Sequence, residues 1–463
     1  MPNSEKYQQL RKEYPVFCYE SISYSTTADG LLISFRFTAG TDIVFEPKTL
    51  IPHRSFADFD RLSQRQYNTL VFQMGMIEMV SYWKCVCSPK VVIKPFTMGQ
   101  QQLEFWKKLY FNGLGEFFYI NGISATQDDF MDIVCESGET MQPIDFETDT
   151  GKHLVPIGGG KDSVVTLEVL RKAGTAFRPL IINPRGATTE CARIAGFAPD
   201  EVFEIHRTID KRLLELNGQG YLNGHTPFSA MLAFYTLLAS ALTGYGSIAL
   251  SNENSANEAT VIGTSVNHQY SKSIEFENDF RQYVKQYVSP NFNYFSFLRP
   301  LAELQIAMLF AQNPQYFSVF RSCNVGSKQN IWCGNCPKCL FAYIILSPFI
   351  EPATMKRIFD KNLLDDSTLQ NHFDELTGLA PTKPFECVGT ISEVNAALAM
   401  TKRRFYATGG APLLLQDFHG GFDMAALSDF CTENNLSEPL QTLLRSEVEK
   451  AQVYFQKAVA GNV

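Results

Sequence analysis

The chain has 463 residues, of which 45% are apolar, 13% aromatic and only 19% charged. So much apolar and aromatic surface can offset the chain entropy of folding, which excludes wholesale disorder. The 48 acidic residues outnumber the 40 basic ones, for a formal net charge of −8. This balance counts against a protein that tracks nucleic-acid phosphates, although a local basic patch can be hidden in an acidic total.

The first 150 residues predict an α+β module, because strand-like and helical patterns mix within them. The strand-like runs lie at 16–24, 31–37, 42–46 and 91–94, and the helical patterns at 64–84 and 99–110. The N-terminus lacks the apolar stretch of a signal peptide. The 11 cysteines are odd in number and scattered, unlike those of a disulfide-stapled secreted protein, so we expect a cytoplasmic protein.

From His153 onward, short apolar runs alternate with helical patterns. The strand-like runs lie at 153–157, 178–184 and 201–205, and the helical patterns at 163–173, 188–195 and 211–216. Such alternation is typical of βαβ units, so we predict an α/β domain at 151–320, with a parallel sheet and helices on both faces. We predict a cysteine knuckle at 321–350 and a helical region at 351–463, which ends in an amphipathic stretch at 436–459.

The segment 228–250 has no charged residue and is the candidate for a membrane span. Serine, threonine and glycine interrupt it, whereas a span needs roughly 18 or more unbroken apolar residues. A helix at 226–243, a turn at 244–246 and a buried strand at 247–251 explain the same residues. We therefore expect a soluble protein without a membrane partner.

A glycine-rich turn leads from the strand at 153–157 into an amphipathic helix; its residues are Gly158, Gly159, Gly160, Lys161, Asp162 and Ser163. Three glycines let the backbone turn tightly with exposed N–H groups, and the helix N-terminus adds a positive dipole end. Together they predict a cradle for an anion, most often a phosphate. Ser163 is suited to cap the helix and to donate its hydroxyl to a phosphate. The spacing is not that of the ordinary nucleotide P-loop or the dinucleotide turn, and a junction with glycines for packing is the alternative.

A cysteine cluster follows, with Cys323, Cys333, Cys336 and Cys339 at the spacing of a tetrahedral thiolate site. Gly334 and Pro337 allow the tight knuckle that such a site needs. Free cysteines near a helix start and an iron–sulfur cluster are the alternatives. A four-cysteine zinc site has no open coordination position, so its role would be structural.

The loop sequence GGGKDS resembles the Ser-Gly-Gly-x-Asp-Ser loop of the ATP pyrophosphatase (PP-loop) superfamily, with Gly158 replacing the first serine and its hydroxyl. The resemblance implies an enzyme that splits ATP between the α- and β-phosphates and transfers AMP to a carboxylate or carbonyl oxygen. It also implies that Asp162 and Glu253 hold magnesium and that the adenine lies against Asn183. The cysteine spacing resembles the zinc knuckle of the 7-cyano-7-deazaguanine synthases of this superfamily, which favours zinc.

Five longer strings narrow the resemblance to the UDP-N-acetylmuramoyl-L-alanyl-L-glutamate epimerase family of peptidoglycan synthesis. They lie at 82–89, 105–122, 266–273, 320–325 and 383–389, so the resemblance spans nearly the whole chain. It implies an ATP- and magnesium-dependent inversion of the terminal L-glutamate to D-glutamate, with release of AMP and diphosphate. Forming an acyl adenylate removes the carboxylate charge and makes the α-proton acidic enough to leave.

Inversion requires an acid and a base on opposite faces of Cα, each within hydrogen-bond reach. The candidates are Cys387, His268, Lys272 and His225, although a lone cysteine or histidine is more often structural. Basic side chains that could grip a diphosphate or carboxylate are Lys272, Arg299, Arg321 and Arg404, although such side chains are usually solvated surface.

Two rival functions are compatible with the loop. One is another PP-loop AMP-forming enzyme, a ligase or a modifier of nucleobases or tRNA, and the other is a non-catalytic nucleotide-binding regulator. The acidic net charge favours a small-molecule enzyme over one that acts on tRNA. Because ATP and a UDP-linked dipeptide are anionic, we expect a locally positive cleft within the acidic total. The sequence leaves the oligomeric state open.

Overall fold

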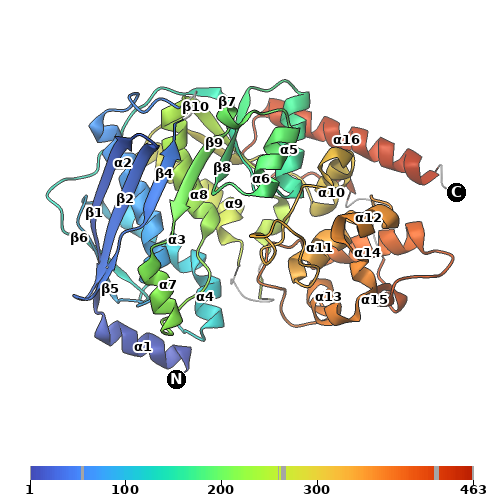
Figure 1. The fold of residues 1–463 in the computed structure, drawn as a ribbon, viewed down its shortest axis with the longest axis horizontal. Coiled ribbons are helices and arrows are strands. Elements are labelled where there is room, and N and C mark those ends of the chain that lie inside the picture. The colour runs from blue at the N-terminus through green and yellow to red at the C-terminus, as the bar shows by residue number, and fades with distance from the viewer. Residues whose placement is uncertain (1, 54–56, 259, 262–266, 422–426, 461–463) are drawn as a thin grey trace. The chain divides into compact units, whose positions relative to one another are not determined.

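The computed structural model describes residues 2–53, 57–258, 260–261, 267–421 and 427–460. They form a mixed α/β fold in which strands and helices alternate before a helical C-terminal region (Figure 1). The chain divides into two compact units. The first contains residues 1–154, 203–248 and 266–294, and the second contains residues 155–202, 249–265 and 295–463.

The elements of the first unit come from three separate stretches of the chain. Before residue 154 they are α1 (Asn3–Glu13), β1 (Val16–Thr27), β2 (Gly30–Ala39), β3 (Ile43–Phe45), β4 (Lys48–Pro52), α2 (Gln64–Trp83), β5 (Lys90–Ile93), α3 (Gln100–Gly113), α4 (Gly115–Ile120), β6 (Asp132–Cys135) and the start of β7 (Asp149–Pro156). The later stretches add β9 (Phe203–Thr208), α7 (Lys211–Gly218), α8 (Phe228–Thr243), most of β10 (Tyr245–Leu250), η3 (Tyr270–Lys272), α9 (Ile274–Tyr287) and the start of β11 (Asn293–Ser296).

The sheet of the first unit mixes both strand directions. Its strand order is β9-β4-β2-β1-β5-β6, and β1, β2 and β4 lie side by side in Figure 1. The pairs β1–β2, β2–β4 and β4–β9 are antiparallel, whereas β1–β5, β5–β6 and β7–β10 are parallel. The purely parallel sheet predicted from the alternating pattern is therefore wrong for the strand near 201–205, because β9 pairs with β4 in antiparallel register, Leu50 opposite His206.

Helix α2 forms the centre of the first unit's core. A capping box between Ser63 and Gln66 starts it, and every residue from Thr69 to Trp83 is buried, because β1 and β2 pack on it as well as α8. Each large apolar side chain buried in this way contributes about 1.5–3 kcal/mol. At Gly75 the helix passes so close to β1 that a Cβ would lie 1.7 Å from the Tyr19 hydroxyl oxygen.

The uncharged segment at 228–250 forms helix α8 and strand β10, as the sequence predicts. Gly244 ends the helix in a left-handed conformation, φ 74°, which glycine adopts without strain. No helix in the described residues is both long and apolar enough to cross a membrane.

The second unit carries the helical C-terminal region. Its elements are α5 (Lys161–Lys172), β8 (Phe177–Ile182), α6 (Gly186–Ile194), η1 (Pro199–Glu201), η2 (Asn254–Asn257), α10 (Glu303–Ala311), η4 (Pro314–Tyr316), α11 (Pro337–Leu346), α12 (Pro352–Phe359), η5 (Leu363–Asp365), η6 (Ser367–Leu369), α13 (Gln370–Thr377), α14 (Ile391–Phe405), α15 (Leu413–Gln416) and α16 (Glu438–Ala460). Helix α10 packs against α5, α11, α14 and α16, and apolar side chains from all of these helices form one core.

In the second unit, the segments that follow β7, β8, β10 and β11 lie at one edge of the sheet. The Ile157 N–H donates to the Leu180 carbonyl at 2.8 Å, so the glycine turn leaves the sheet beside β8. The Phe297 N–H donates to the Leu250 carbonyl at 2.7 Å, which places the residues after β10 beside those after β11. Because the carboxyl ends of parallel strands meet at one edge, this is where a ligand site is expected in an α/β fold.

Candidate functional site

The glycine turn is shaped by two close contacts and one open position. Gly159 has φ 80°, and a Cβ there would lie 2.8 Å from the Ala187 Cβ at the start of α6. A Cβ on Gly160 would lie 2.8 Å from the Ser322 Oγ, whereas one on Gly158 would meet nothing within 4 Å. The left-handed backbone and the contact with α6 therefore require glycine at 159, a Cβ at 160 would displace only the Ser322 hydroxyl, and Gly158 leaves the backbone open to an anion.

Helix α5 begins with Lys161, two residues before the predicted helical pattern at 163–173. Its N-cap is Gly160, and no side chain caps the N-terminus. Ser163 is the third helical residue, where its hydroxyl donates to the Gly160 carbonyl at 3.0 Å, so the expected capping by Ser163 is wrong. Asn183 follows β8 directly and has a left-handed backbone, φ 52°, which asparagine tolerates better than most residues.

Lys161 is buried between two carboxylates at the start of α5. Its Nζ lies 2.5 Å from the Asp162 Oδ1 and also pairs with Glu303, the first residue of α10. Burial lowers the pKa of Lys161, but the charges of Asp162 and Glu303 outweigh burial and raise it, so the ammonium is retained. Burial raises the pKa of Glu303 well above its usual range, and Lys161 opposes that rise.

Two further carboxylates belong to the same group. The Glu393 Oε2 accepts from the N–H and hydroxyl of Thr390, at 2.8 Å each, and its Oε1 accepts from the Glu303 N–H at 2.6 Å. Burial raises the pKa of Glu393. Glu253 is buried, its charge raises the pKa of both Glu303 and Glu393, and its carbonyl accepts from Arg299 at 2.8 Å. The Lys161 ammonium is the cation that Asp162 and Glu303 share, and in the described residues these carboxylates do not form a group of three converging metal-ligand atoms.

Glu303 and Glu393 were missed by the sequence-based prediction, although each left a signal. Thr390 and Glu393 have the capping-box spacing, and the structure forms that box at the start of α14. Glu303 is the single charged residue of helix α10, whose other residues are apolar apart from Gln305. A buried charge of this kind needs a partner, and Lys161 supplies it.

The segment 383–389, which carries Cys387, packs against these carboxylates. A Cβ on Gly389 would lie 3.1 Å from the Glu303 Cγ and 3.2 Å from the Glu393 Oε2. Cys387 itself is half-buried. Among the predicted basic residues, Arg321 lies beside the loop, because its backbone N–H donates to the Gly159 carbonyl at 2.8 Å.

Two of the other predicted basic residues have structural contacts. Arg299 is fully buried and donates to Glu253 and to the Ser296 Oγ at 3.2 Å. Arg404, in the last turn of α14, donates to the Pro348 carbonyl at 2.7 Å.

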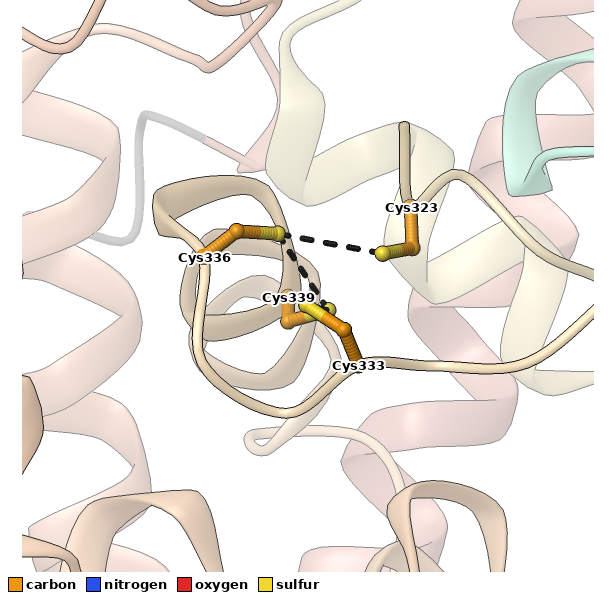
Figure 2. A group of neighbouring side chains, drawn as sticks. All are labelled: Cys323, Cys333, Cys336 and Cys339. Atoms are coloured by element: carbon orange, nitrogen blue, oxygen red, sulfur yellow. Dashed lines mark hydrogen bonds between the residues drawn. The ribbon is translucent and has the colours of Figure 1, made fainter. Parts of the chain in front are cut away.

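The four predicted cysteines lie together (Figure 2). The sulfur–sulfur distances are 3.9 Å for Cys323–Cys336, 3.7 Å for Cys333–Cys339 and 3.5 Å for Cys336–Cys339. Cys336 is the N-cap of α11, and its hydrogen bond with Cys339 lowers its pKa to about 5, while that of Cys339 is raised. Four sulfurs at these distances could hold one metal ion such as zinc.

A second group of possible metal ligands lies in the first unit. Glu116 lies at the start of α4. Its Oε2 is 3.4 Å from the His225 Nδ1 and also contacts the His268 Nδ1. Burial, with the charges of His268 and Lys84, lowers the pKa of His225 to about 4. The structure thus brings together two of the predicted acid–base candidates. Lys272 ends η3 and is half-buried.

The fold and these sites define a mixed α/β protein with a glycine-rich turn at a helix N-terminus and a cluster of four cysteines that could hold a metal. Two family models assign the class: the MurL N-terminal domain matches residues 8–297 and the MurL C-terminal domain matches residues 317–415. The chain belongs to the MurL family, which confirms the resemblance to the epimerase family inferred from the sequence, while membership of the PP-loop superfamily stays a prediction. Val266, the first residue of one of the strings that carried it, lies outside the described residues.

Three similar proteins carry the name UDP-N-acetyl-alpha-D-muramoyl-L-alanyl-L-glutamate epimerase. The one from Xanthomonas oryzae is 36% identical over 72% of this chain and 74% of its own length. The one from Salinispora tropica is 33% identical over 86% of both chains, and the one from a Micromonospora species is 34% identical over 71% and 73%. No solved structure matches the chain.

Proposed function

We propose that this chain is an ATP- and magnesium-dependent epimerase of peptidoglycan precursor synthesis in the cytoplasm. It inverts the terminal L-glutamate of UDP-N-acetylmuramoyl-L-alanyl-L-glutamate to D-glutamate. The family and the epimerase names of three relatives support this reaction over ligation or nucleobase modification. The observation that carries the ATP-dependent part is the gathering of Asp162, Glu253 and Glu303 at the glycine loop.

The reaction needs activation because a carboxylate's α-proton is hardly acidic. Its removal would place two negative charges on one small unit. When bound, ATP would supply the AMP group that turns the carboxylate into an acyl adenylate with diphosphate as the leaving group, and magnesium would neutralise phosphate charge. The proton then leaves from one face and returns to the other, and hydrolysis of the adenylate ends the cycle.

The loop and the carboxylates suit these two groups as a PP-loop type site. The open backbone at Gly158 and the N-terminus of α5 would hold phosphate oxygens, together with Gly159, Gly160, Lys161 and Ser163. Asp162 and Glu253 supply the carboxylate oxygens that magnesium prefers. Asn183, at the end of the neighbouring strand, would border the adenine, as the superfamily resemblance implies.

Proton transfer requires groups on opposite faces of the glutamate Cα. The rings of His225 and His268 have centroids 4.5 Å apart, whereas a carbon between two rings needs about 3.5–4 Å to each. The two imidazoles therefore cannot flank Cα as a pair. We propose Cys387 as one of the two groups, because its segment packs beside the carboxylates of the loop; a role for His225, His268 or Lys272 stays a prediction.

The reaction is tested by incubating the protein with ATP, magnesium and the UDP-muramoyl dipeptide that ends in L-glutamate. Chiral analysis of the glutamate after hydrolysis should show D-glutamate, with AMP formed in parallel. AMP release without any D-glutamate, from an active preparation, would refute the epimerase assignment.

The role of Cys387 is tested separately with Cys387→Ser. Loss of a general acid or base costs roughly 10²–10⁴-fold, so D-glutamate formation should fall by about 100-fold or more. AMP release should fall less, because adenylation precedes proton transfer. The matched control is Cys431→Ser, which replaces another half-buried cysteine of the same unit. Unchanged epimerisation in Cys387→Ser would exclude this residue.

We propose zinc for the four-cysteine site. With a Zn–S bond of about 2.3 Å, a regular tetrahedron has sulfur–sulfur edges of about 3.8 Å. The distances of 3.5–3.9 Å fit these edges. The ligands of a cluster with several irons surround a larger core and lie farther apart. The expected role is structural, because four thiolates leave no open position.

A further inference from the structure

The first unit contains a cluster of Glu116, His225 and His268 that the proposed adenylation site does not use. The three residues come from the start of α4, from the loop before α8 and from the residues before η3. Their potential ligand atoms all lie within 4.8 Å of one another. Their side chains are only 11%, 20% and 12% exposed, so the cluster is largely shielded from solvent.

The loop that carries His225 is held in place from both sides of the histidine. The Lys84 Nζ donates to the Gly224 carbonyl and, at 2.7 Å, to the Thr226 Oγ1. The Asn121 side chain, next to the end of α4, donates to the backbone of the same loop at 3.2 Å. These bonds hold the loop on both sides of His225, and the bond from Asn121 ties it to the end of α4, the helix that carries Glu116.

The segment that carries His268 is anchored in the same region. It leads into η3, which packs against α3, α8 and α9. The residue before η3 is Gln269, whose N–H donates to the Asn267 Oδ1 at 2.8 Å. The three side chains are therefore presented by packed elements, which is the preorganisation that a binding site requires.

We propose that Glu116, His225 and His268 bind one divalent transition-metal ion such as Zn²⁺. Imidazole nitrogens and a carboxylate oxygen are the donors of that ion, and two histidines with one carboxylate is a donor set of zinc and ferrous sites. The close approach of both Nδ1 atoms to one carboxylate gives the converging geometry that an ion needs. This assignment uses the two imidazoles as ligands rather than as acid and base.

The proposed site differs in kind from the four-cysteine site. Three ligands from the protein leave a fourth position for water or for an anionic oxygen of a bound molecule, such as a phosphate or carboxylate. The thiolate site has no such position.

Cobalt(II) distinguishes the two sites in one experiment on the metal-depleted full-length protein. Cobalt on thiolates gives intense sulfur-to-metal charge-transfer bands, whereas cobalt on nitrogen and oxygen ligands gives only weak d–d bands. With excess magnesium present to occupy the carboxylates at the glycine loop, we expect the wild type to bind two equivalents of cobalt and to show both spectra. His268→Ala should lose the weak bands and one equivalent and keep the charge-transfer bands.

Glu116→Gln serves as a second variant that nearly preserves shape. The metal affinity of the nitrogen–oxygen site should fall by about tenfold or more, because even residues that only orient metal ligands cost roughly that much when they are changed. The matched control is His206→Ala, because the His206 Nε2 also contacts a carboxylate, that of Glu204 at 3.1 Å, without belonging to a three-ligand group in the described residues. This control should keep both equivalents.

Two outcomes would overturn the proposal. One is a wild type that binds cobalt with the thiolate spectrum alone. The other is a folded His268→Ala or Glu116→Gln variant, checked by circular dichroism, with the stoichiometry, affinity and spectrum of the wild type. Because no nucleotide or dipeptide is present, this test is independent of the epimerase assignment.

Discussion

The cysteine site and the set of four carboxylates at the glycine loop differ in how far apart their residues lie in the sequence. All four sulfurs come from the short stretch between Cys323 and Cys339, whereas the carboxylates of Asp162, Glu253, Glu303 and Glu393 come from four distant segments. A site with local ligands can be recognised from spacing alone. A site assembled from distant segments depends on the fold, so mutations should affect the two sites differently.

The largest expected effect is on the assembled site, through Asp162→Ala. Losing a preorganised electrostatic group of this kind costs about 10²–10³-fold, and AMP release should fall by that much while the fold persists by circular dichroism. The matched control is Glu190→Ala, which removes an exposed carboxylate paired with Arg193 on α6. Undiminished AMP release by Asp162→Ala would contradict the loop assignment.

The local site is broken most directly by Cys336→Ser. We expect one equivalent of zinc to be lost by elemental analysis. The variant should also lose about 2 kcal/mol or more of stability, which is a fall in Tm of roughly 4–8 °C for a unit of this size. The glycine loop should remain formed, because its glycines pack against α6 and Ser322. A brown protein with iron and labile sulfide would overturn the choice of zinc.

Glu303→Gln tests whether Glu303, which the sequence did not predict, belongs to the nucleotide site at the glycine loop. The change removes one of the two carboxylates that pair with Lys161, leaving Asp162 to neutralise the ammonium alone. We expect the KM for magnesium-bound ATP to rise by about tenfold with little change in kcat. Glu168→Gln is the control, since Glu168 is a buried carboxylate of α5, the helix that begins with Lys161, and it is bonded to Arg171 and Tyr316. An equal KM in both variants would remove Glu303 from the site.

The smallest effect is expected from Thr390→Ala at the start of α14. Loss of the N-cap costs about 1 kcal/mol and removes one of the hydrogen bonds to Glu393, whose carboxylate still accepts from the backbone N–H groups of residue 390 and Glu303. Thermal unfolding should show this loss, with a modest rise in the KM for magnesium-bound ATP. A stability equal to that of the wild type would show that the cap does not hold this helix end.

Much of the secondary structure could be predicted because it depends on nearby residues. The uncharged segment 228–250 predicted a helix and a strand, and α8 and β10 formed there. The direction of β9 could not be predicted, because its antiparallel partner β4 lies far away in the chain and alternation alone does not name a partner. Ser163 was expected to cap α5, but Gly160 is the N-cap and the helix begins at Lys161, so Ser163 lies inside the first turn.

The sequence by itself determined the family, the glycine turn and the cysteine site, because each of these depends on residue types at short, regular spacings. Only the tertiary structure decided that Glu303 and Glu393 join Asp162, and that Glu116 joins His225 and His268. These residues lack a common local pattern. The folded chain brings them together because burying a charged or polar side chain requires a partner, and that partner can come from any part of the chain.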